Sequence, residues 1–382
     1  MEQNIVLLFE NLSFVHLKKD VFLLPYYLGH EMGYNVRIVY SPEFLDETLP
    51  SEYRGVRLVP LRLRGNPHSW FLYREWEFFV YTLCHAREID VLIRFHLTLV
   101  TALLLLLYKL LNPRGKAYVK LDGYLPALFG SKRKSLAERL KYKVMRMALR
   151  KIDLFTCETY RMYERFIGNA ELKFLMRDKL YFLPNGFDEA EIGRLQIEER
   201  KYGDKENVMI TVGRLGVKDK NTEMLLNALA QVNLKDWKVY LIGPIEPTFI
   251  PFIDDFFKKN PEKRERVIFT DSISDKQELW DYYNRAKVFV LTSRAESYAL
   301  VLNEAKRFRD YIVSTDVGAA HDLLESRKYG VLVDQENPAV LACVCQDIID
   351  GKRRVDVYPD FDPSVLAWDG LIRNARICEK LR

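Results

Sequence analysis

The chain has 382 residues, of which 48% are hydrophobic and 29% are charged, and its 58 basic and 53 acidic residues give a net charge of +5. This balance excludes an intrinsically disordered protein, and the length allows two or three domains. The longest apolar run, residues 97–108, is shorter than the roughly 20 residues needed to span a bilayer. We therefore expect a buried helix in that run.

The sequence contains no pattern that is typical of a metal or disulfide protein. Its five cysteines are scattered, and no Asp-x-Asp triplet is present of the kind that binds divalent cations. The apolar segment 4–9 is too short for a secretory signal, and no basic residue precedes it. We expect a cytoplasmic protein that needs neither a metal nor a bound cofactor.

The first half alternates short apolar strands with helices. Strands are predicted at 5–9, 35–40, 90–95, 117–121, 153–157 and 180–183, and helices at 20–32, 97–108, 135–151 and 160–167. This order is typical of a parallel α/β sheet. The turn signal Pro-Asn-Gly at 184–186 ends the series.

A second alternating series follows residues 189–207, which are rich in charge and typical of a linker. Strands are predicted at 208–212, 237–242, 267–269, 288–291 and 312–314, and a helix at 221–232. The chain should therefore form two doubly wound α/β domains, 1–190 and 191–364. The segment 365–382 should pack back on the first domain as a helix.

Two cations follow the strand 208–212. Gly213 and Arg214 close this strand, and Lys220 precedes the next helix. An arginine fork and a lysine point charge can together hold a diphosphate. A solvated polar turn is the alternative interpretation, and Lys218 competes with Lys220 for the same role.

Two glutamates, Glu296 and Glu304, flank a helix start that follows the strand 288–291. The helix N-terminus presents backbone N–H groups at Tyr298, Ala299 and Leu300, and such a terminus suits a phosphate. Carboxylates can accept hydrogen bonds from sugar hydroxyls. Acidic residues are also favoured near a helix start without any ligand.

Three segments together resemble glycosyltransferase family 4: 183–188 (LPNGFD), 212–228 (VGRLGVKDKNTEMLLNA) and 294–325 (RAESYALVLNEAKRFRDYIVSTDVGAAHDLLE). This resemblance implies a GT-B fold, in which two Rossmann-like domains face each other across a cleft. It implies a retaining hexosyltransferase that uses a UDP- or GDP-type nucleotide sugar. The acceptor would be a glycan or a lipid-linked molecule in cell-surface polysaccharide synthesis.

The resemblance also implies roles for single residues. Arg214 and Lys220 would hold the phosphates of the donor, whose departing diphosphate takes the proton of the acceptor hydroxyl. Glu296 would contact the donor sugar and Glu304 the ribose. The expected donor site comprises Gly213, Arg214, Lys220, Glu296, Ser297, Tyr298, Ala299, Leu300 and Glu304, and the expected catalytic residues are Arg214, Lys220, Glu296 and Asp122.

The first domain departs from the family pattern. The loop 10–20 contains no glycine, and Asp122 stands where many members have a histidine. Asp122 ends a strand, where functional loops are common, although an Asp-Gly turn explains it equally well. His16 and His96, which follow strand regions, and Asn185 of the segment LPNGFD are weaker site candidates.

The segment 131–151 carries nine basic residues and one acidic residue. Leu136, Leu140, Val144 and Met147 recur on one helical face, and basic residues recur on another. Such a helix can lie on an anionic membrane, as a peripheral protein on the inner face. It can equally pack its apolar face on a domain core. Nothing in the sequence indicates a nucleic-acid module.

Two other functions remain open at this point. A sugar-nucleotide epimerase can share the GT-B fold, and a non-catalytic subunit could bind a nucleotide sugar or a glycan. The order of Arg214, Lys220 and the two glutamates favours the transferase. Slow hydrolysis of a donor to free sugar would separate an enzyme from a binding subunit.

Overall fold

A computed structural model describes residues 2–42, 49–61, 71–121 and 135–382. The chain divides into two compact units: unit 1 holds Met1–Gly186 with Trp368–Arg382, and unit 2 holds Phe187–Ala367. The first boundary was predicted after residue 190, and the return to the first domain at residue 365. In the structure the chain enters unit 2 after Gly186 and returns to unit 1 at Trp368.

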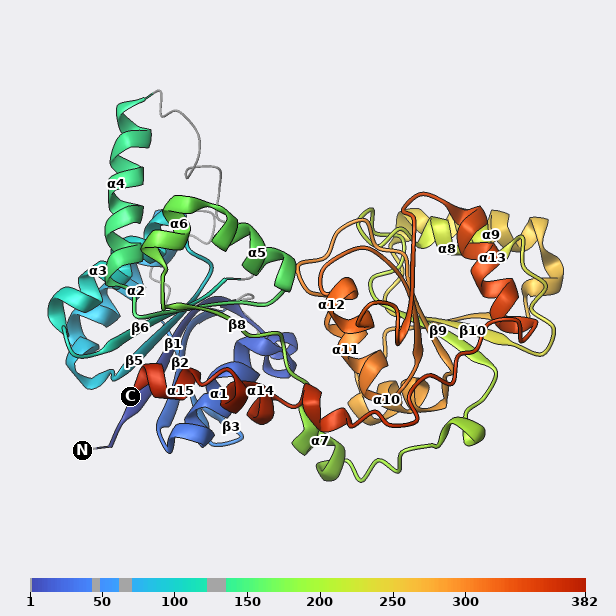
Figure 1. Ribbon diagram of the computed structural model, residues 1–382, viewed down its shortest axis with the longest axis horizontal. Helices are drawn as coiled ribbons and strands as arrows, with labels where there is room; N and C mark the ends of the chain where they lie inside the picture. Colours follow the sequence, from blue (N-terminus) through green and yellow to red (C-terminus); the bar gives the residue numbers. More distant parts are fainter. Residues whose placement is uncertain (1, 43–48, 62–70, 122–134) are drawn as a thin grey trace. The chain divides into compact units, whose positions relative to one another are not determined.

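Unit 1 is built on a sheet with the strand order β3-β4-β2-β1-β5-β6-β7-β8 in the described residues (Figure 1). The strands are β1 (Asn4–Leu12), β2 (Asn35–Pro42), β3 (Glu52–Tyr53), β4 (Val56–Pro60), β5 (Val91–Phe95), β6 (Lys116–Leu121), β7 (Leu154–Cys157) and β8 (Leu180–Phe182). Neighbours pair in parallel, except that β3 and β4 are antiparallel.

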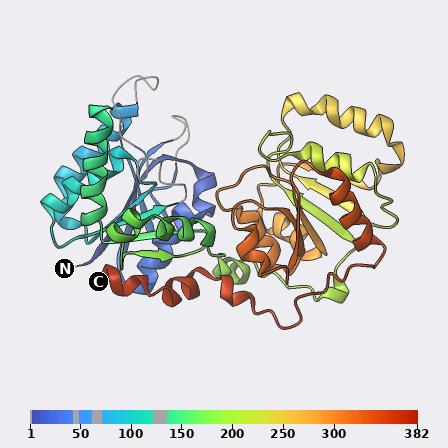
Figure 2. The ribbon, with the colours of Figure 1, turned by 45° about the horizontal axis from the view of Figure 1, so that its top comes forward.

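Helices cover both faces of this sheet because successive strand residues point to opposite sides. Ile5 and Leu7 pack against α1 (Asp20–Met32), α14 (Trp368–Asn374) and α15 (Ile377–Leu381). Val6 and Leu8 pack on the other face with α2 (Phe71–His85), α3 (Leu99–Leu111) and α4 (Leu136–Lys151). The C-terminal helices lie beside α1 (Figure 2). The unit is completed by α5 (Tyr160–Gly168) and α6 (Ala170–Leu175).

The apolar run 97–108 forms α3, with Leu104, Leu105 and Tyr108 buried, which confirms the prediction of a buried helix. In the described residues no helix is long and apolar enough to cross a membrane.

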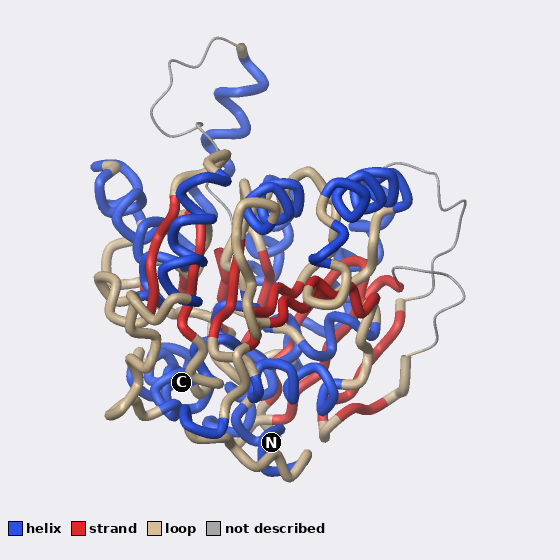
Figure 3. The backbone as a smooth tube through the Cα atoms, turned by 90° about the vertical axis from the view of Figure 1, so that its right-hand side faces the viewer, coloured by secondary structure: helices blue, strands red, loops and turns tan. Residues whose placement is uncertain are grey.

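Helix α4 does not bury all of the apolar face that packing on the domain core requires. Its buried residues are Met145, Ala148 and Leu149, whereas Leu136 is 82% exposed and Leu140 is 63% exposed. The first turns of α4 extend beyond the neighbouring helices of unit 1, as Figures 1 and 3 show. The start of this face is therefore largely without a packing partner among the described residues of unit 1.

Unit 2 has the strand order β11-β10-β9-β12-β13-β14 in its sheet, and all pairs are parallel. The strands are β9 (Val208–Val212), β10 (Lys238–Ile242), β11 (Val267–Asp271), β12 (Val288–Leu291), β13 (Tyr311–Thr315) and β14 (Gly330–Val333). One face packs on α8 (Thr222–Leu229), α9 (Ile250–Lys259) and α13 (Pro338–Ile349), and the other on α10 (Lys276–Arg285), α11 (Leu300–Arg307) and α12 (Ala320–Leu324).

The segment 189–207 is part of unit 2 and not a free linker. It begins with α7 (Glu189–Arg194), and two of its glutamates form ion pairs inside unit 2. The buried guanidinium of Arg307 pairs with Glu189 and, at 2.8 Å, with Glu199. Two of the charged residues in this segment therefore pair with a buried arginine, which composition alone could not distinguish from a linker.

Both sheets reverse their strand order next to their first strand. In unit 1 the chain builds outward from β1 to β2 and then continues at β5 on the other side. In unit 2 it builds from β9 to β10 and β11 and then continues at β12. Ligands of doubly wound sheets bind at such switch points, beyond the carboxyl ends of the strands. The two switch points, β1/β5 and β9/β12, are therefore the places to search for a site.

Candidate active site

The end of β9 is shaped by the contact of two glycines. The Gly213 N–H donates to the carbonyl of Ile242 at 2.9 Å. Gly243 has φ +137°, and a Cβ there would lie 1.9 Å from the Gly213 carbonyl oxygen. Only glycine permits this approach of β10 to the strand end. The next residue, Arg214, is exposed, and in the described part of the chain no acidic residue pairs with its guanidinium.

Lys220 and Glu296 contact each other directly across the β9/β12 switch point. The Lys220 Nζ lies 2.5 Å from Glu296 Oε1. The Ser293 hydroxyl donates to the same oxygen at 2.6 Å. Gly213, Arg214, Lys220, Thr292 and Ser293 belong to the lining of one small pocket here. The structure thus brings Lys220 to the predicted carboxylate, whereas the side chain of Lys218 is exposed.

The loop that carries Lys220 is held by residues that the sequence analysis did not single out. Arg294 pairs with the Glu336 carboxylate at 2.5 Å and also donates to the backbone carbonyl of Lys218. The Thr292 hydroxyl donates to the carbonyls of Lys220 and Asn221. Asn221 has φ +50° and donates from its amide to Glu336 at 3.2 Å. The signal for Asn221 in the sequence was its residue type, because asparagine is enriched at left-handed positions of the backbone.

Glu304 lies in α11, on the face toward α10. Its Oε1 accepts a hydrogen bond from Trp280 Nε1, and its Oε2 accepts one from the Tyr283 hydroxyl, both at 3.1 Å. Trp280 and Tyr283 were not predicted as site residues. The only signal in the sequence was an indole and a phenol three positions apart, a spacing that puts both on one face of a helix.

The start of α11 differs in detail from the prediction. The helix begins at Leu300, with Ala299 as its N-cap at φ +72°. A left-handed conformation is one that glycine adopts more readily than alanine. Tyr298 and Ala299 are buried, and the Tyr298 carbonyl accepts a hydrogen bond from the Ala319 N–H at 2.8 Å. Ser297 is exposed beside them.

The weaker candidates of unit 1 lie at the carboxyl ends of its strands, and Asp122 lies outside the described residues. Nδ1 of His16 accepts from the Ser13 N–H and lies 2.9 Å from the Ser13 hydroxyl, so His16 closes a local turn. His96 is exposed, with φ +56°, directly after β5. Asn185 is buried and donates to Glu158 Oε2 at 2.9 Å.

A buried ion cluster, which the sequence analysis missed, fills the β1/β5 switch point. Arg94 of β5 donates to Glu10 at 3.0 Å, to Glu75 at 3.1 Å and to the Leu8 carbonyl at 3.0 Å. Burial and a hydrogen bond with Glu10 raise the pKa of Glu75 to about 8. Although burial alone would raise it, the hydrogen bond with Glu75 and the charge of Arg94 leave the pKa of Glu10 lowered.

A second buried cation lies at the end of β6. The ammonium of Lys120 contacts Asp20 Oδ2 at 2.5 Å and Glu158 Oε2 at 3.0 Å. Lys120 and Arg94 both interrupt apolar strands, and this interruption was the signal in the sequence for both clusters.

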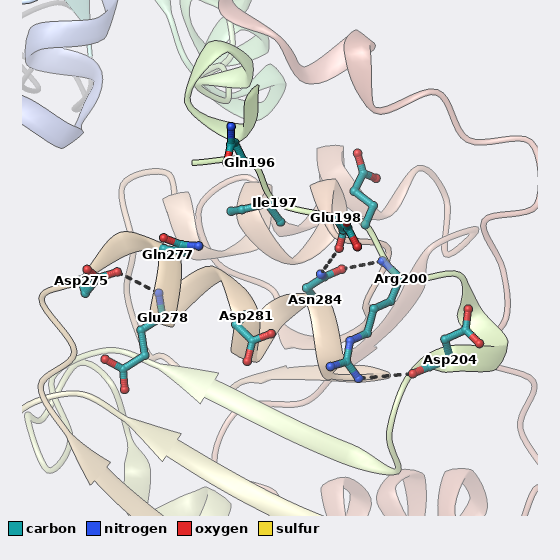
Figure 4. Close-up of a pocket in the computed structure, with 11 residues that line it drawn as sticks. Gln196, Ile197, Glu198, Arg200, Asp204, Asp275, Gln277, Glu278, Asp281 and Asn284 are labelled. Atoms are coloured by element: carbon teal, nitrogen blue, oxygen red, sulfur yellow. Dashed lines mark hydrogen bonds between the residues drawn. The ribbon is translucent and has the colours of Figure 1, made fainter. Parts of the chain in front are cut away.

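A larger cavity of about 690 Å³ lies in unit 2, apart from the predicted site residues (Figure 4). It is lined by Gln196, Ile197, Glu198, Glu199, Arg200, Asp204, Asp275, Gln277, Glu278, Asp281 and Asn284. Asn284 of α10 bridges its wall by donating to the Glu198 carbonyl and accepting from the Arg200 N–H. None of the residues described above as candidates lines it. In the described residues, no group of three or more His, Cys, Asp and Glu side chains is arranged to hold a metal.

Comparison with known proteins gives a family match that lies within unit 2. Residues 206–350 match the family model described as glycosyl transferases group 1. A 78-residue stretch is 36% identical to D-inositol 3-phosphate glycosyltransferase 1 of Catenulispora acidiphila. This alignment covers 20% of the chain and 19% of the relative, so the chain matches about a fifth of that protein.

Solved structures match nearly the whole chain at low identity. The lipopolysaccharide outer core galactosyltransferase WaaB has a TM-score of 0.68 at 13% identity, over 99% of this chain and 100% of that one. A glycosyltransferase from Rickettsia africae has a TM-score of 0.65 at 11% identity, over 100% and 98%. HepE of Anabaena, in complex with UDP and glucose, has a TM-score of 0.65 at 16% identity, over 100% of this chain and 99% of that one. The chain therefore has the GT-B fold, and its unit 2 is similar to the group 1 glycosyltransferases.

Proposed function

We propose that the chain is a retaining glycosyltransferase of family 4 that transfers a sugar from a nucleotide diphosphate sugar to a glycan or lipid-linked acceptor. The observation that carries this proposal is the pair of cations at the β9/β12 switch point. Arg214 is exposed there without an acidic partner in the described residues, and Lys220 lines the same pocket. Both lie within the stretch that matches the group 1 family model.

The reaction needs stabilisation of a departing nucleoside diphosphate. The bond between the anomeric carbon and the phosphate oxygen breaks, and the acceptor oxygen bonds to the same face of that carbon. The acceptor hydroxyl gives its proton to the departing phosphate oxygen. Arg214 and Lys220 offset the negative charge that develops on the diphosphate, and such preorganised charge is commonly the largest catalytic term.

When no ligand is bound, Glu296 pairs with the ammonium of Lys220. An incoming phosphate competes with Glu296 for the Lys220 ammonium. The Ser293 hydroxyl retains Glu296 Oε1, so the carboxylate stays beside the pocket when the lysine turns to phosphate. Glu296 is then available to accept a hydrogen bond from a hydroxyl of the donor sugar.

The solved relatives support a nucleotide sugar as the donor. HepE binds UDP and glucose in one structure and UDP-glucose in another. We therefore propose UDP or GDP as the nucleotide, with UDP tested first. We also propose cell-surface polysaccharide synthesis as the role of the enzyme, since WaaB acts in the lipopolysaccharide outer core and the acceptor is expected to be a glycan or a lipid.

We propose further that α4 docks on an anionic lipid surface, where lipid-linked acceptors are found. Leu136 and Leu140 are exposed on its first turns, and Arg139, Lys141 and Lys143 are exposed beside them. An apolar edge flanked by basic side chains is what an interfacial helix presents. Binding of the protein to vesicles with phosphatidylserine should disappear when Leu136 and Leu140 are changed to Ser, and absence of binding by the unchanged protein would contradict the proposal.

The experiment that tests the proposed function is a thermal-shift screen followed by product analysis. UDP, GDP and their sugars should raise the midpoint of unfolding, because a ligand of the folded state stabilises it. Incubation with the stabilising donor should release nucleoside diphosphate and sugar. An epimerase would instead interconvert the sugar, and a binding subunit would bind without turnover. No shift with any nucleotide would overturn the proposal.

A further inference from the structure

We propose that Trp280 and Tyr283 are positioning residues that make Glu304 a reader of two neighbouring hydroxyls on the ribose of the donor. The inference rests on the proposed function, because it assumes a nucleotide sugar. It concerns two residues of α10, a helix outside the motif that carries the glycosyltransferase resemblance.

The hydrogen bonds fix both ends of the Glu304 carboxylate. Trp280 Nε1 donates to Oε1 and the Tyr283 hydroxyl donates to Oε2, each at 3.1 Å. Burial and the neighbouring charge of Glu304 raise the pKa of Tyr283 well above its ordinary range, so its hydroxyl stays a donor. With one donor on each oxygen, the carboxylate can neither rotate nor turn toward solvent without breaking a hydrogen bond.

Neither aromatic side chain can move aside, because both are packed among other rings. Trp280 is 1% exposed and stacks on Phe187 at 4.8 Å between ring centroids. Tyr283 is fully buried and stacks on Phe289 at 5.6 Å. Phe308 of the same cluster contacts both rings, at 5.8 and 6.1 Å. The two donors are therefore rigid supports for Glu304.

The hydrogen-bonding capacity of Glu304 is only half used by these supports. A carboxylate offers about four acceptor positions, two on each oxygen. Trp280 and Tyr283 occupy one on each, which leaves one on each oxygen for a ligand. Glu304 is partly exposed, so these positions are accessible. Two parallel acceptors at the spacing of a carboxylate match a pair of vicinal hydroxyls.

The charge of Glu304 is also uncompensated within the described residues. No lysine, arginine or histidine there forms an ion pair with its carboxylate, and its partners are two neutral donors. If Glu304 only stabilised the fold, a cationic partner or an apolar residue in its place would give a more stable fold. An anion that two neutral donors hold in one orientation instead suits recognition of hydroxyl groups.

The test compares a ribonucleotide donor with its 2′,3′-dideoxy analogue. In Tyr283→Phe the KM of the ribonucleotide donor should rise about tenfold, since a hydrogen bond to a charged group is lost. The KM of the dideoxy donor should not change, because its ribose has no hydroxyl that could donate a hydrogen bond to Glu304. The KM of the acceptor should also stay unchanged. Trp280→Phe should behave in the same way, and Tyr282→Phe, on the same helix but packed on Tyr240, is the matched control.

Three outcomes would overturn the inference. Equal increases in KM for both donors would mean that Tyr283 supports only the fold. Unchanged KM for both would mean that Glu304 does not depend on Tyr283. Absence of nucleotide binding by the unchanged protein would overturn the proposed function and this inference together. Tyr283→Phe removes a single oxygen, so the test stands even if Trp280→Phe does not fold, and thermal unfolding of each variant verifies folding.

Discussion

Each of the two switch points of this molecule holds an arginine, but the two arginines differ in how their charge is paired. At β1/β5 the guanidinium of Arg94 is enclosed by Glu10, Glu75 and a backbone carbonyl. At β9/β12 the guanidinium of Arg214 is exposed, and the described residues give it no acidic partner. The same topological position therefore serves the fold in unit 1 and remains available to a ligand in unit 2.

The contrast shows why fold alone does not identify a site. Both units have parallel sheets with a strand reversal, and both carry arginine there. In unit 1 the charge of Arg94 is satisfied internally, so an anionic ligand would have to displace Glu10 and Glu75 from a buried cation. In unit 2 a phosphate would compete with Glu296 for the ammonium of Lys220. Among the described residues, no acidic side chain pairs with Arg214.

The largest effect is expected when the unit 1 cluster is broken. Arg94→Met should lower the free energy of unfolding by about 3–5 kcal/mol, because the Glu10 carboxylate and the buried Glu75 lose the cation that contacts both. Urea unfolding measures the loss. Arg37→Met, in which a half-exposed arginine of β2 is changed, is the control and should lose far less. If Arg94→Met is as stable as the control, the cluster does not hold the fold.

The next effect concerns catalysis in unit 2. Arg214→Ala should lower kcat by about 10²- to 10³-fold, because the departing diphosphate loses one preorganised cation. The midpoint of thermal unfolding should stay the same, since the side chain is exposed. Initial rates of nucleotide release measure kcat, and Lys218→Ala is the matched control. Turnover equal to that of the control would contradict the assignment.

A smaller effect with two opposite signs is expected for Glu296→Gln. The neutral amide releases the Lys220 ammonium, so the affinity for free UDP or GDP should rise about tenfold. Turnover should fall, because the amide replaces the carboxylate that receives a sugar hydroxyl. Calorimetric titration and steady-state rates give the two values. A loss of nucleotide affinity would show that Glu296 does not compete with phosphate.

The smallest effect is a change in the pH dependence of stability. The pKa of Glu75 is about 8 in the folded chain against an ordinary 4.5, so the folded state holds a proton that the unfolded chain releases. The stability from this proton is complete below pH 4.5 and is lost as the pH rises through about 8. In Glu75→Gln this loss of stability with rising pH should be absent.

The comparison that tests this prediction is the stability of Glu75→Gln against the unchanged protein from pH 5 to pH 8. The variant should gain relative stability as the pH rises. Glu10, whose lowered pKa acts in the opposite direction, is present in both proteins. A difference that does not vary with pH would show that Glu75 has no raised pKa.

The sequence predicted the elements whose apolar pattern is strong and local. The predicted strands 208–212 and 288–291 coincide with β9 and β12, and the helix 135–151 corresponds to α4. The short strands β3 and β4, and the strand β14, were not predicted, because their sequences are too short or too mixed to show a period. The helix α2 was also missed, and with it Glu75.

The candidate site was predictable where its residues belong to the segments that carry the family resemblance. The motif named Lys220 and Glu296, which contact each other across 76 positions of sequence. The supports were not predictable in this way. Arg94 reaches Glu10 across 84 positions, and Trp280 reaches Glu304 from a helix that no motif includes. Pairings of this kind depend on the tertiary fold, which a single sequence does not display.

The central claim is that Arg214 and Lys220 hold the diphosphate of a nucleotide. Calorimetric titration with UDP and uridine, and with GDP and guanosine, tests it most directly. We expect one nucleoside diphosphate to bind much more tightly than its nucleoside, and Arg214→Ala to weaken the diphosphate while leaving the nucleoside unchanged. Equal affinity for diphosphate and nucleoside in the unchanged protein would contradict the claim.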